Sequence, residues 1–301
     1  TTNYLLYNAA GSTTYNGKAY LSNNIFSRLN NNGTAVYIGD TVRSKLDYNL
    51  YYSGGLVHNY QCGSPAITTS ALQAWRSATS NDLNSLTYDP GMVDPVNYDF
   101  RPNASNVNAW SVNGRGNHFV GDTMDILGVT RAKTRFQGVP DLGAYEFVPT
   151  TTPPAAVATP ASPVASTPQA FTFGEDTVCV INWGASVPTS ATVRQYTGVQ
   201  ATGMPAGFGK MYFYNDVSTP LGVYSYKAVP YYKNPWLGDI SSETNARIAK
   251  SSNGAAWQGY NYTNGITDTI LNTMTTAAFL DSMPSKFTGV ENGRIGIRCV
   301  V

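Results

Sequence analysis

Three short triplets near the start of the chain repeat one pattern, an asparagine followed by two apolar residues. They are Asn3-Tyr4-Leu5, Asn24-Ile25-Phe26 and Asn49-Leu50-Tyr51, at spacings of 21 and 25 residues. A repeat of this length predicts coils of parallel strands, in which each coil stacks its apolar positions on the next. Asparagine tolerates left-handed backbone at turns, and equivalent side chains can bond along the stack as a ladder. A β-sandwich with similar short strands is the alternative.

Composition limits the partners of the chain. Only 12% of the 301 residues are charged and the net charge is +1, so no basic surface is expected to hold nucleic acid or an anionic membrane. No apolar run approaches 18 residues, which predicts a chain that does not span a membrane. The 21 tyrosines and the many Asn, Thr, Ser and Gly residues are typical of extracellular all-β proteins. Because the first residues already have a strand pattern, we expect a piece of a longer exported protein.

A stretch rich in Pro, Thr and Ala, residues 149–169, divides the chain. It lacks bulk and periodicity, and its prolines favour extended polyproline geometry, so it is predicted to be a semi-rigid linker. The expected organisation is therefore 1–148, the linker 149–169, and 170–301.

The last part, 170–301, is predicted to be a β-sandwich of short strands. Asn-Gly pairs at 253–254, 264–265 and 292–293 are strong hairpin signals. The expected strands are 171–173, 177–183, 191–196, 210–214, 223–232, 245–250, 256–262, 267–275 and 294–300.

One short helix is expected within the first part, at Thr69–Thr79, where Leu72 and Trp75 supply apolar bulk. Ser80 is interpreted as a helix N-cap for the residues that follow it.

Residues with catalytic potential are few. His58 and His118 lie far from any recognisable nucleophile or zinc spacing, and we interpret both as exposed loop residues. Polysaccharide-cleaving β-helices use carboxylates with Arg or Lys, or a bound Ca²⁺, as acid, base or charge neutraliser. The local mixture of this kind comprises Asp94, Asp99, Asp122, Asp125, Arg101, Arg115 and Arg131. This mixture lacks the ligand density of a calcium loop, so we predict no catalytic site and no metal site. Calcium is the one cofactor that stays open as an alternative.

Two further features of 170–301 concern its stability and its ligand binding. Cys179 and Cys299 lie near the first and last expected strands of 170–301, and we hypothesise a disulfide between them; the alternative is two buried free thiols. Tyr231, Tyr232 and Trp236 lie in a loop-like segment and are predicted to be exposed contacts for carbohydrate. Core packing is the alternative for these aromatic residues.

Two segments carry a family resemblance. Val93-Asp94-Pro95 with Asp99-Phe100-Arg101, followed by the motif Asp141-Leu142-Gly143-Ala144-Tyr145-Glu146-Phe147, resembles the closing region of right-handed parallel β-helix proteins exported by Bacteroidetes. The resemblance implies that 1–148 is the C-terminal part of such a helix and that 141–147 is a strand that closes it. The order of segments over 183–293 is similar to β-sandwich modules of type IX secretion cargo.

This resemblance also implies modification of the exported chain. Bacteroidetes O-glycosylate Asp-(Ser/Thr)-apolar triplets, and five occur here, which predicts a glycoprotein. The acceptors would be Thr41, Thr123, Thr177, Thr269 and Ser282. The alternative is that Asp-Thr pairs mark strand ends and turns.

The expected function is a non-catalytic, adhesin-like structural protein at the cell surface or outside the cell. Its expected partners are carbohydrate or other surface protein copies, including copies of itself in a fibre formed through the open first coil. Two alternatives stay open: a polysaccharide lyase or hydrolase whose active coils lie outside this chain, and a phage tailspike or fibre.

Overall fold

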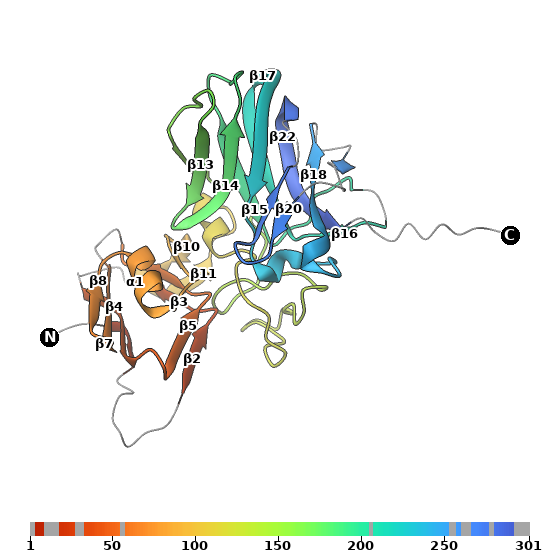
Figure 1. Ribbon diagram of the computed structural model, residues 1–301. Coiled ribbons are helices and arrows are strands. Elements are labelled where there is room, and N and C mark those ends of the chain that lie inside the picture. Colours follow the sequence, from red (N-terminus) through yellow and green to blue (C-terminus); the bar gives the residue numbers. More distant parts are fainter. Residues whose placement is uncertain are drawn as a thin grey trace. The chain divides into compact units, whose positions relative to one another are not determined.

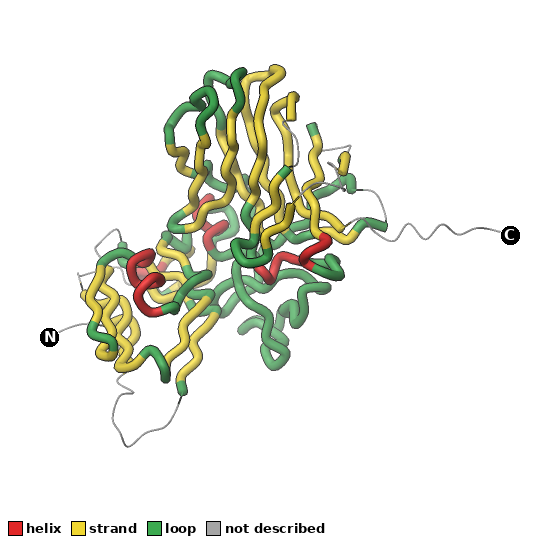
Figure 2. Tube along the Cα trace, in the orientation of Figure 1, coloured by secondary structure: helices red, strands yellow, loops and turns green. Residues whose placement is uncertain are grey.

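The chain folds into two compact units that consist mainly of β-strands (Figures 1 and 2). The computed structural model describes residues 4–8, 18–27, 33–54, 58–204, 207–252, 257–259, 266–276 and 280–291. Unit 1 comprises residues 1–133 and 140–151, and unit 2 comprises 134–139 and 152–301. The all-β class expected from the composition is confirmed for the described residues.

Unit 1 contains eleven strands and one α-helix among its described residues. The strands are β1 (Tyr4–Asn8), β2 (Ala19–Ser22), β3 (Ile25–Ser27), β4 (Gly33–Asp40), β5 (Ser44–Asp47), β6 (Leu50–Tyr52), β7 (His58–Ser64), β8 (Ile67–Thr69), β9 (Leu86–Thr87), β10 (Met92–Asp94) and β11 (Asp99–Pro102). The helices are α1 (Leu72–Thr79) and the short 3₁₀ helices η1 (Pro95–Asn97) and η2 (Val107–Ser111).

Strands β1 to β7 form two successive tiers and part of a third, paired in parallel. We call β1, β2 and β3 the first tier, and β4, β5 and β6 the second. Strand β2 pairs with β5, and β3 pairs with β6, where Ile25 lies opposite Leu50, 25 residues on. The second tier continues onto β7 and β9. The spacing of 25 is thus a true tier period, whereas the spacing of 21 is not, because Tyr4 pairs with Thr34 rather than with Ile25.

The predicted asparagine ladder forms between Asn24 and Asn49. The side-chain amide of Asn24 donates to Oδ1 of Asn49 over 3.1 Å, and the backbone N–H of Asn24 donates to the same atom. The amide of Asn49 in turn donates to the carbonyl of Leu21. The ladder satisfies polar groups at a buried corner, where an unpaired group would cost about 1–3 kcal/mol.

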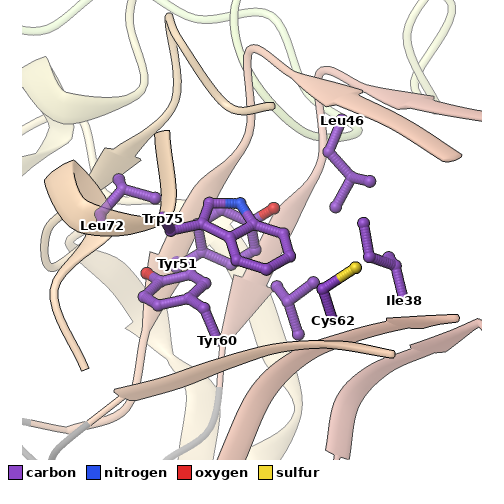
Figure 3. Close-up of a cluster of buried hydrophobic side chains, with 8 residues drawn as sticks. Ile38, Leu46, Tyr51, Tyr60, Cys62, Leu72 and Trp75 are labelled. Atoms are coloured by element: carbon purple, nitrogen blue, oxygen red, sulfur yellow. The ribbon is translucent and has the colours of Figure 1, made fainter. Parts of the chain in front are cut away.

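The interior of unit 1 is an aromatic stack closed by helix α1 (Figure 3). Phe26 stacks on Tyr51 in the next tier, and Tyr51 meets Tyr60 edge-on at 5.6 Å. Trp75 of α1 stacks on Tyr60 and is fully buried in the middle of the cluster. Helix α1 begins three residues later than expected and ends at Thr79, followed by Ser80 as a left-handed C-cap. The N-cap interpretation of Ser80 is therefore wrong, because its N–H bonds back to Arg76 and closes the preceding helix.

A buried carboxylate fixes α1 against this stack. Asp82 is fully buried, and it accepts hydrogen bonds from the Tyr51 hydroxyl and the Trp75 indole N–H, each at 3.0 Å, and from the Ser85 hydroxyl at 2.5 Å. Burial raises the pKa of Asp82, and these donors oppose the rise. The carboxylate thus connects the second tier, the helix and the turn that follows it.

The motif over 141–147 runs beside the first tier and is not a strand. Gly143 has a φ of +81°, and its N–H donates to the carbonyl of Asn23 over 2.7 Å. A β-carbon at this position would lie 2.7 Å from Cδ1 of Ile25, so the close approach needs glycine. The expected closing strand is corrected, since the left-handed glycine bends the chain where a strand would continue.

Unit 2 is built on one large sheet (Figure 1). Its strand order is β12-β13-β14-β17-β22-β18-β19, and β15 and β16 pair with β17 and β22. The strands are β12 (Val157–Thr159), β13 (Pro168–Phe173), β14 (Asp176–Trp183), β15 (Thr192–Thr197), β16 (Gly209–Lys210), β17 (Phe213–Pro230), β18 (Ala246–Ser251), β19 (Gln258–Gly259), β20 (Ile266–Asp268), β21 (Thr273–Thr275) and β22 (Leu280–Glu291), with 3₁₀ helices η3 (Asn234–Leu237) and η4 (Glu243–Asn245). Burial alternates along β13 and β15, so one face of each strand covers a core.

Several expected strands of unit 2 are corrected. The segments 210–214 and 223–232 contribute to a single long strand, β17. The pairing of β17 with β22 skips from Val217 to Gly222, around Pro220, which has no N–H to donate. The expected strand 267–275 is the hairpin of β20 and β21, and β22 was not predicted. The three Asn-Gly turns, the strand 294–300 and most of 256–262 lie outside the described residues.

The expected linker is partly sheet. Strand β12 pairs antiparallel with β13, with Ala158 opposite Phe171. Gln169 is fully buried, donates to the carbonyl of Pro160 over 2.8 Å and accepts from the Trp183 indole over 2.9 Å. Residues 157–160 are thus held to unit 2 by long-range contacts, which local composition does not encode.

Candidate functional site

Two adjoining hollows of unit 1 form the candidate site. The larger hollow has a volume of about 590 Å³, and the smaller one has about 140 Å³. They share Ser27 and Met92 as lining residues, and we call them together the groove. The larger hollow is lined by the tier-one residues Ser22, Asn23, Asn24, Ile25 and Ser27, the hairpin residues Met92, Phe100 and Pro102, and Asp122, Arg131, Leu142, Gly143, Ala144 and Tyr145.

The turn between β2 and β3 forms one wall and is held rigidly. Asn23 has a φ of +60°, a left-handed conformation that asparagine tolerates. Its side chain exchanges two hydrogen bonds with the backbone of Asn117, both of 2.8 Å. Asn24 is fixed by the asparagine ladder. This wall is therefore preformed by contacts on both of its sides.

The hairpin of β10 and β11 forms the opposite wall. Asp94 caps η1 at the hairpin tip by accepting from the N–H and the side-chain amide of Asn97. Phe100 is 48% exposed, and its ring meets that of Tyr98 edge-on at 6.4 Å. The groove thus has an exposed aromatic ring on a strand whose turn is anchored.

Arg131 supplies the fixed positive charge of the larger hollow. Its side chain is only 4% exposed, and its guanidinium lies 3.4 Å from Asp122 and 3.5 Å from Glu146. It also donates to the carbonyl of Gly143 over 2.5 Å, which ties it to the 141–147 motif. Because two carboxylates and a carbonyl surround it, Arg131 is neutralised within the wall of the groove.

Behind this wall lies a network of buried carboxylates. Asp141 accepts backbone N–H groups from Gly114 and Phe147, and burial, followed by repulsion from Glu146, raises its pKa well above the usual range. Burial also raises the pKa of Glu146. For Asp125 burial alone would raise the pKa, but backbone N–H groups, including that of Glu146, outweigh it and lower the value. These groups shape the motif and do not line the groove.

The smaller hollow is arranged around Asp89. Its carboxylate accepts from the N–H of Gly91 over 2.8 Å and from the side-chain amide of Asn108 over 3.2 Å. Burial, followed by the charge of Asp89, raises the pKa of the neighbouring Tyr52 hydroxyl. The remaining lining residues are Pro90, Pro95 and Asn106.

The charged residues singled out from the sequence are not assembled into one centre. Only Asp122 and Arg131 line the groove. Asp99 and Arg101 form an exposed ion pair, and Asp94 caps the hairpin tip. Arg115 is buried and donates to the carbonyl of Trp110 over 3.0 Å. Asp125 is buried as well, so local density in the sequence did not correspond to a shared site.

The predicted exposed aromatic contact is corrected. Tyr232 and Trp236 are only 4% and 2% exposed, and both rings pack near Phe213 in unit 2. Tyr231 is partly buried, and its N–H bonds to the carbonyl of Val178. The segment is not a strand, as its loop-like sequence predicted, and it contains the short 3₁₀ helix η3. Its aromatic side chains are buried, however, and serve core packing.

Other predicted site residues are placed as follows. Cys179 is fully buried and has no disulfide partner among the described residues; Cys299 lies outside them, so the disulfide stays a prediction. Thr269 is exposed, whereas Thr41, Thr123 and Thr177 are partly buried; no side-chain environment is described for Ser282 or His58. Asp40 and Asp268 accept N–H groups two residues on, which gives these triplets a turn role as well. Glycosylation stays a prediction.

The comparisons with known proteins assign no family to the chain. Comparison finds no family model, no curated protein and no solved structure that matches the chain. Within the described part of the chain, no cluster of three or more His, Cys, Asp or Glu side chains could hold a metal ion. Over the same residues, no helix has the length and apolarity needed to cross a membrane.

Sequence reasoning missed most of the groove. Ser27, Phe100 and Tyr145 come from segments far apart in the chain. Phe100 and Tyr145 lie in the two segments that carry the family resemblance, but nothing in those segments indicated that they meet at one hollow. The asparagine repeat was the available signal, since it marked the turn that forms one wall.

Proposed function

We propose that this chain is part of a non-catalytic, adhesin-like protein at a bacterial surface or outside the cell, and that it holds its ligand in the groove of unit 1. In this proposal unit 1 is the closing part of a right-handed parallel β-helix and unit 2 is a β-sandwich. The resemblance to exported Bacteroidetes proteins supports the location outside the cell. The proposal includes export by the type IX secretion route and O-glycosylation of the exported chain.

The observation that carries the proposal is the rigidity of the groove. Its tier-one wall is fixed by Asn49 on one side and by Asn117 on the other, and the 141–147 motif is bonded directly to Asn23. A preformed surface loses little conformational entropy when a ligand binds, which suits adhesion. The 25-residue parallel register supports the β-helix part, and the alternating burial in unit 2 supports the sandwich part.

The carboxylates near the groove favour binding over catalysis. Of the two carboxylates that line the groove, Asp122 is paired with Arg131, and Asp89 accepts from the N–H of Gly91 and the side-chain amide of Asn108. General acid–base cleavage of a glycosidic bond needs two carboxyl groups that face the substrate. The proposal therefore gives the polar residues a holding role.

The test is retention without turnover. Purified full chain is added to polysaccharide-coated surfaces and to intact bacterial cells, and both bound protein and released sugar are measured. We expect retention with no new reducing ends and no unsaturated uronates. Product release that disappears in Asp122→Asn, but persists in Asp239→Asn, the control variant at an exposed aspartate of unit 2, would instead establish a hydrolase or lyase.

Assembly through the first tier is a separate part of the proposal. Among the described strands, β1, β2 and β3 each pair on one side only, so they are the candidate edges for a second copy. Gly143 lies against Ile25 of β3 and donates to the carbonyl of Asn23 just before this strand, so the 141–147 motif covers β3. Strands β1 and β2 are then the candidate open edges. Light scattering at high concentration measures it: a monomer at all concentrations would remove the fibre from the proposal.

A further inference from the structure

The groove has polar groups left without partners. The hydroxyl of Ser22 is buried with no hydrogen-bond partner, and it belongs to the lining of the larger hollow. Among the described residues, Oγ of Ser27 and Oη of Tyr145 also have no partner, and neither does Oδ1 of Asn24, whose amide nitrogen serves the ladder. Most buried polar groups in a protein are paired, so the unpaired hydroxyl of Ser22, beside partly exposed polar groups in the same hollow, points to a ligand.

These groups are neutral hydroxyls and amides. A hydroxyl both donates and accepts, and an amide offers one acceptor and two donors. In the smaller hollow, the amide nitrogen of Asn106 is likewise without a partner among the described residues. Such groups match a ligand that presents many hydroxyls along its length.

Apolar surface lies beside the polar groups. Phe100 is half exposed, and Met92 is shared by both hollows. A pyranose ring has an apolar face of C–H groups and a polar rim, so it can pack on an aromatic ring while its hydroxyls bond at the sides. The groove thus brings together a ring, hydroxyls and amides, which are the groups that sugar units bind.

The charge of the groove selects among sugars. Its charged lining residues are Asp122, Asp89 and Arg131, which is one more carboxylate than guanidinium. Arg131 is already neutralised by Asp122 and Glu146. An acidic sugar would bring a further negative charge with no free cation among these lining residues, so repulsion disfavours it.

We infer that the groove binds a chain of neutral sugar units, with the ring of Phe100 as the stacking surface and Ser22, Ser27 and Tyr145 as hydrogen-bonding groups. The inference rests on the proposed function and names its ligand class. The charge of the groove disfavours chains of uronic or sialic acid.

Calorimetry of the full chain tests the inference. The ligands are cellohexaose, xylohexaose and mannohexaose as neutral chains, with hexagalacturonate and hexaguluronate as acidic ones. Phe100→Ala should weaken the binding of a neutral hexamer about tenfold, because a half-exposed ring supplies roughly 1–1.5 kcal/mol of contact. Phe119→Ala is the matched control: Phe119 is 43% exposed in the same unit and does not line the groove, so its loss should leave affinity unchanged.

The outcomes separate the inference from the proposed function. Binding confined to the acidic hexamers, with loss in Phe100→Ala, would overturn the ligand class and leave the groove as the binding site. Equal affinity of Phe100→Ala and wild type would overturn the stacking role. Retention on cells that no neutral hexamer competes away would overturn the inference while the adhesin proposal stands.

Discussion

Gly143 donates its backbone N–H to the carbonyl of Asn23 over 2.7 Å, across 120 residues of sequence. The same glycine lies against Ile25, where a β-carbon would meet Cδ1 at 2.7 Å. The 141–147 motif thus begins its contact with the first tier through a residue that has no side chain. This contact also forms part of the groove wall, so stability and the candidate site depend on one glycine.

Gly143→Ala should destabilise unit 1 by about 2–4 kcal/mol, because a left-handed alanine costs about 1 kcal/mol and overpacking adds about 1–3. Gly128→Ala is the matched control: its φ is +82°, but nothing lies within 4 Å of the added β-carbon. Urea unfolding, monitored by hydrogen exchange of amides in unit 1, should show that the control lowers the free energy of unfolding by about 1 kcal/mol. Equal losses for the two variants would contradict the Ile25 contact.

Trp75→Phe should destabilise unit 1 more than Trp110→Phe does. Both indoles donate one hydrogen bond, but Trp75 donates to the buried carboxylate of Asp82, whereas Trp110 donates to the carbonyl of Thr151. Hydrogen bonds to charged groups contribute about 1.5–3 kcal/mol, compared with about 1 for neutral ones. Thermal unfolding measures both, and the reverse order would contradict the role of Asp82 in fixing α1.

The stability of unit 1 should fall as pH rises above the usual carboxyl range. The folded state raises the pKa of Asp82, Asp141 and Glu146, with burial as the first cause in each case. A raised acid pKa means that the folded chain binds protons more readily than the unfolded chain. This contribution is full below the unfolded values, near 4, and is lost as pH rises through the raised folded values.

Unfolding free energies between pH 4 and pH 8 measure this effect. Each proton bound on folding contributes a slope of about 1.4 kcal/mol per pH unit. Asp141→Asn should flatten the slope whatever its effect on total stability, since the variant cannot titrate. A stability that rises steadily with pH over the same interval would contradict the assignment.

Gln169→Glu should release β12 from unit 2. The new carboxylate can still accept from the Trp183 indole, but it has no N–H for the carbonyl of Pro160. Amide exchange at residues 157–159 should quicken by about tenfold, corresponding to roughly 1.4 kcal/mol. Gln195→Glu, which also loses a donor to a backbone carbonyl, is the control and should leave 157–159 protected.

Cys179 should resist alkylation in the folded protein. Burial raises the pKa of its thiol to about 12, and no part of its side chain is exposed. Since the thiolate is the nucleophile, iodoacetamide at pH 8 should label Cys179 only after denaturant is added. Denatured, unreduced protein that still leaves Cys179 unlabelled would reveal the disulfide with Cys299.

The fold was predicted from sequence where the signal is local and periodic. The 25-residue spacing of Asn24 and Asn49 predicted both the parallel register and the ladder, because stacked tiers repeat chemistry at a fixed interval. Helix α1 followed from the apolar residues Leu72 and Trp75. The errors fall where residues far apart in the chain decide the local structure. Strand β12, for example, has the sequence of a linker and becomes a strand because it pairs with β13.

The groove could not be predicted in the same way. Ser27, Phe100, Arg131 and Tyr145 lie in four separate segments, and only tertiary contacts bring them to one hollow. The sequence by itself determined the strand-rich class, the tier period and the low charge, since these depend on composition and spacing. The tertiary structure decided which carboxylates are neutralised, which aromatic rings stay exposed and where Gly143 lies, because burial and pairing depend on residues far apart in the chain.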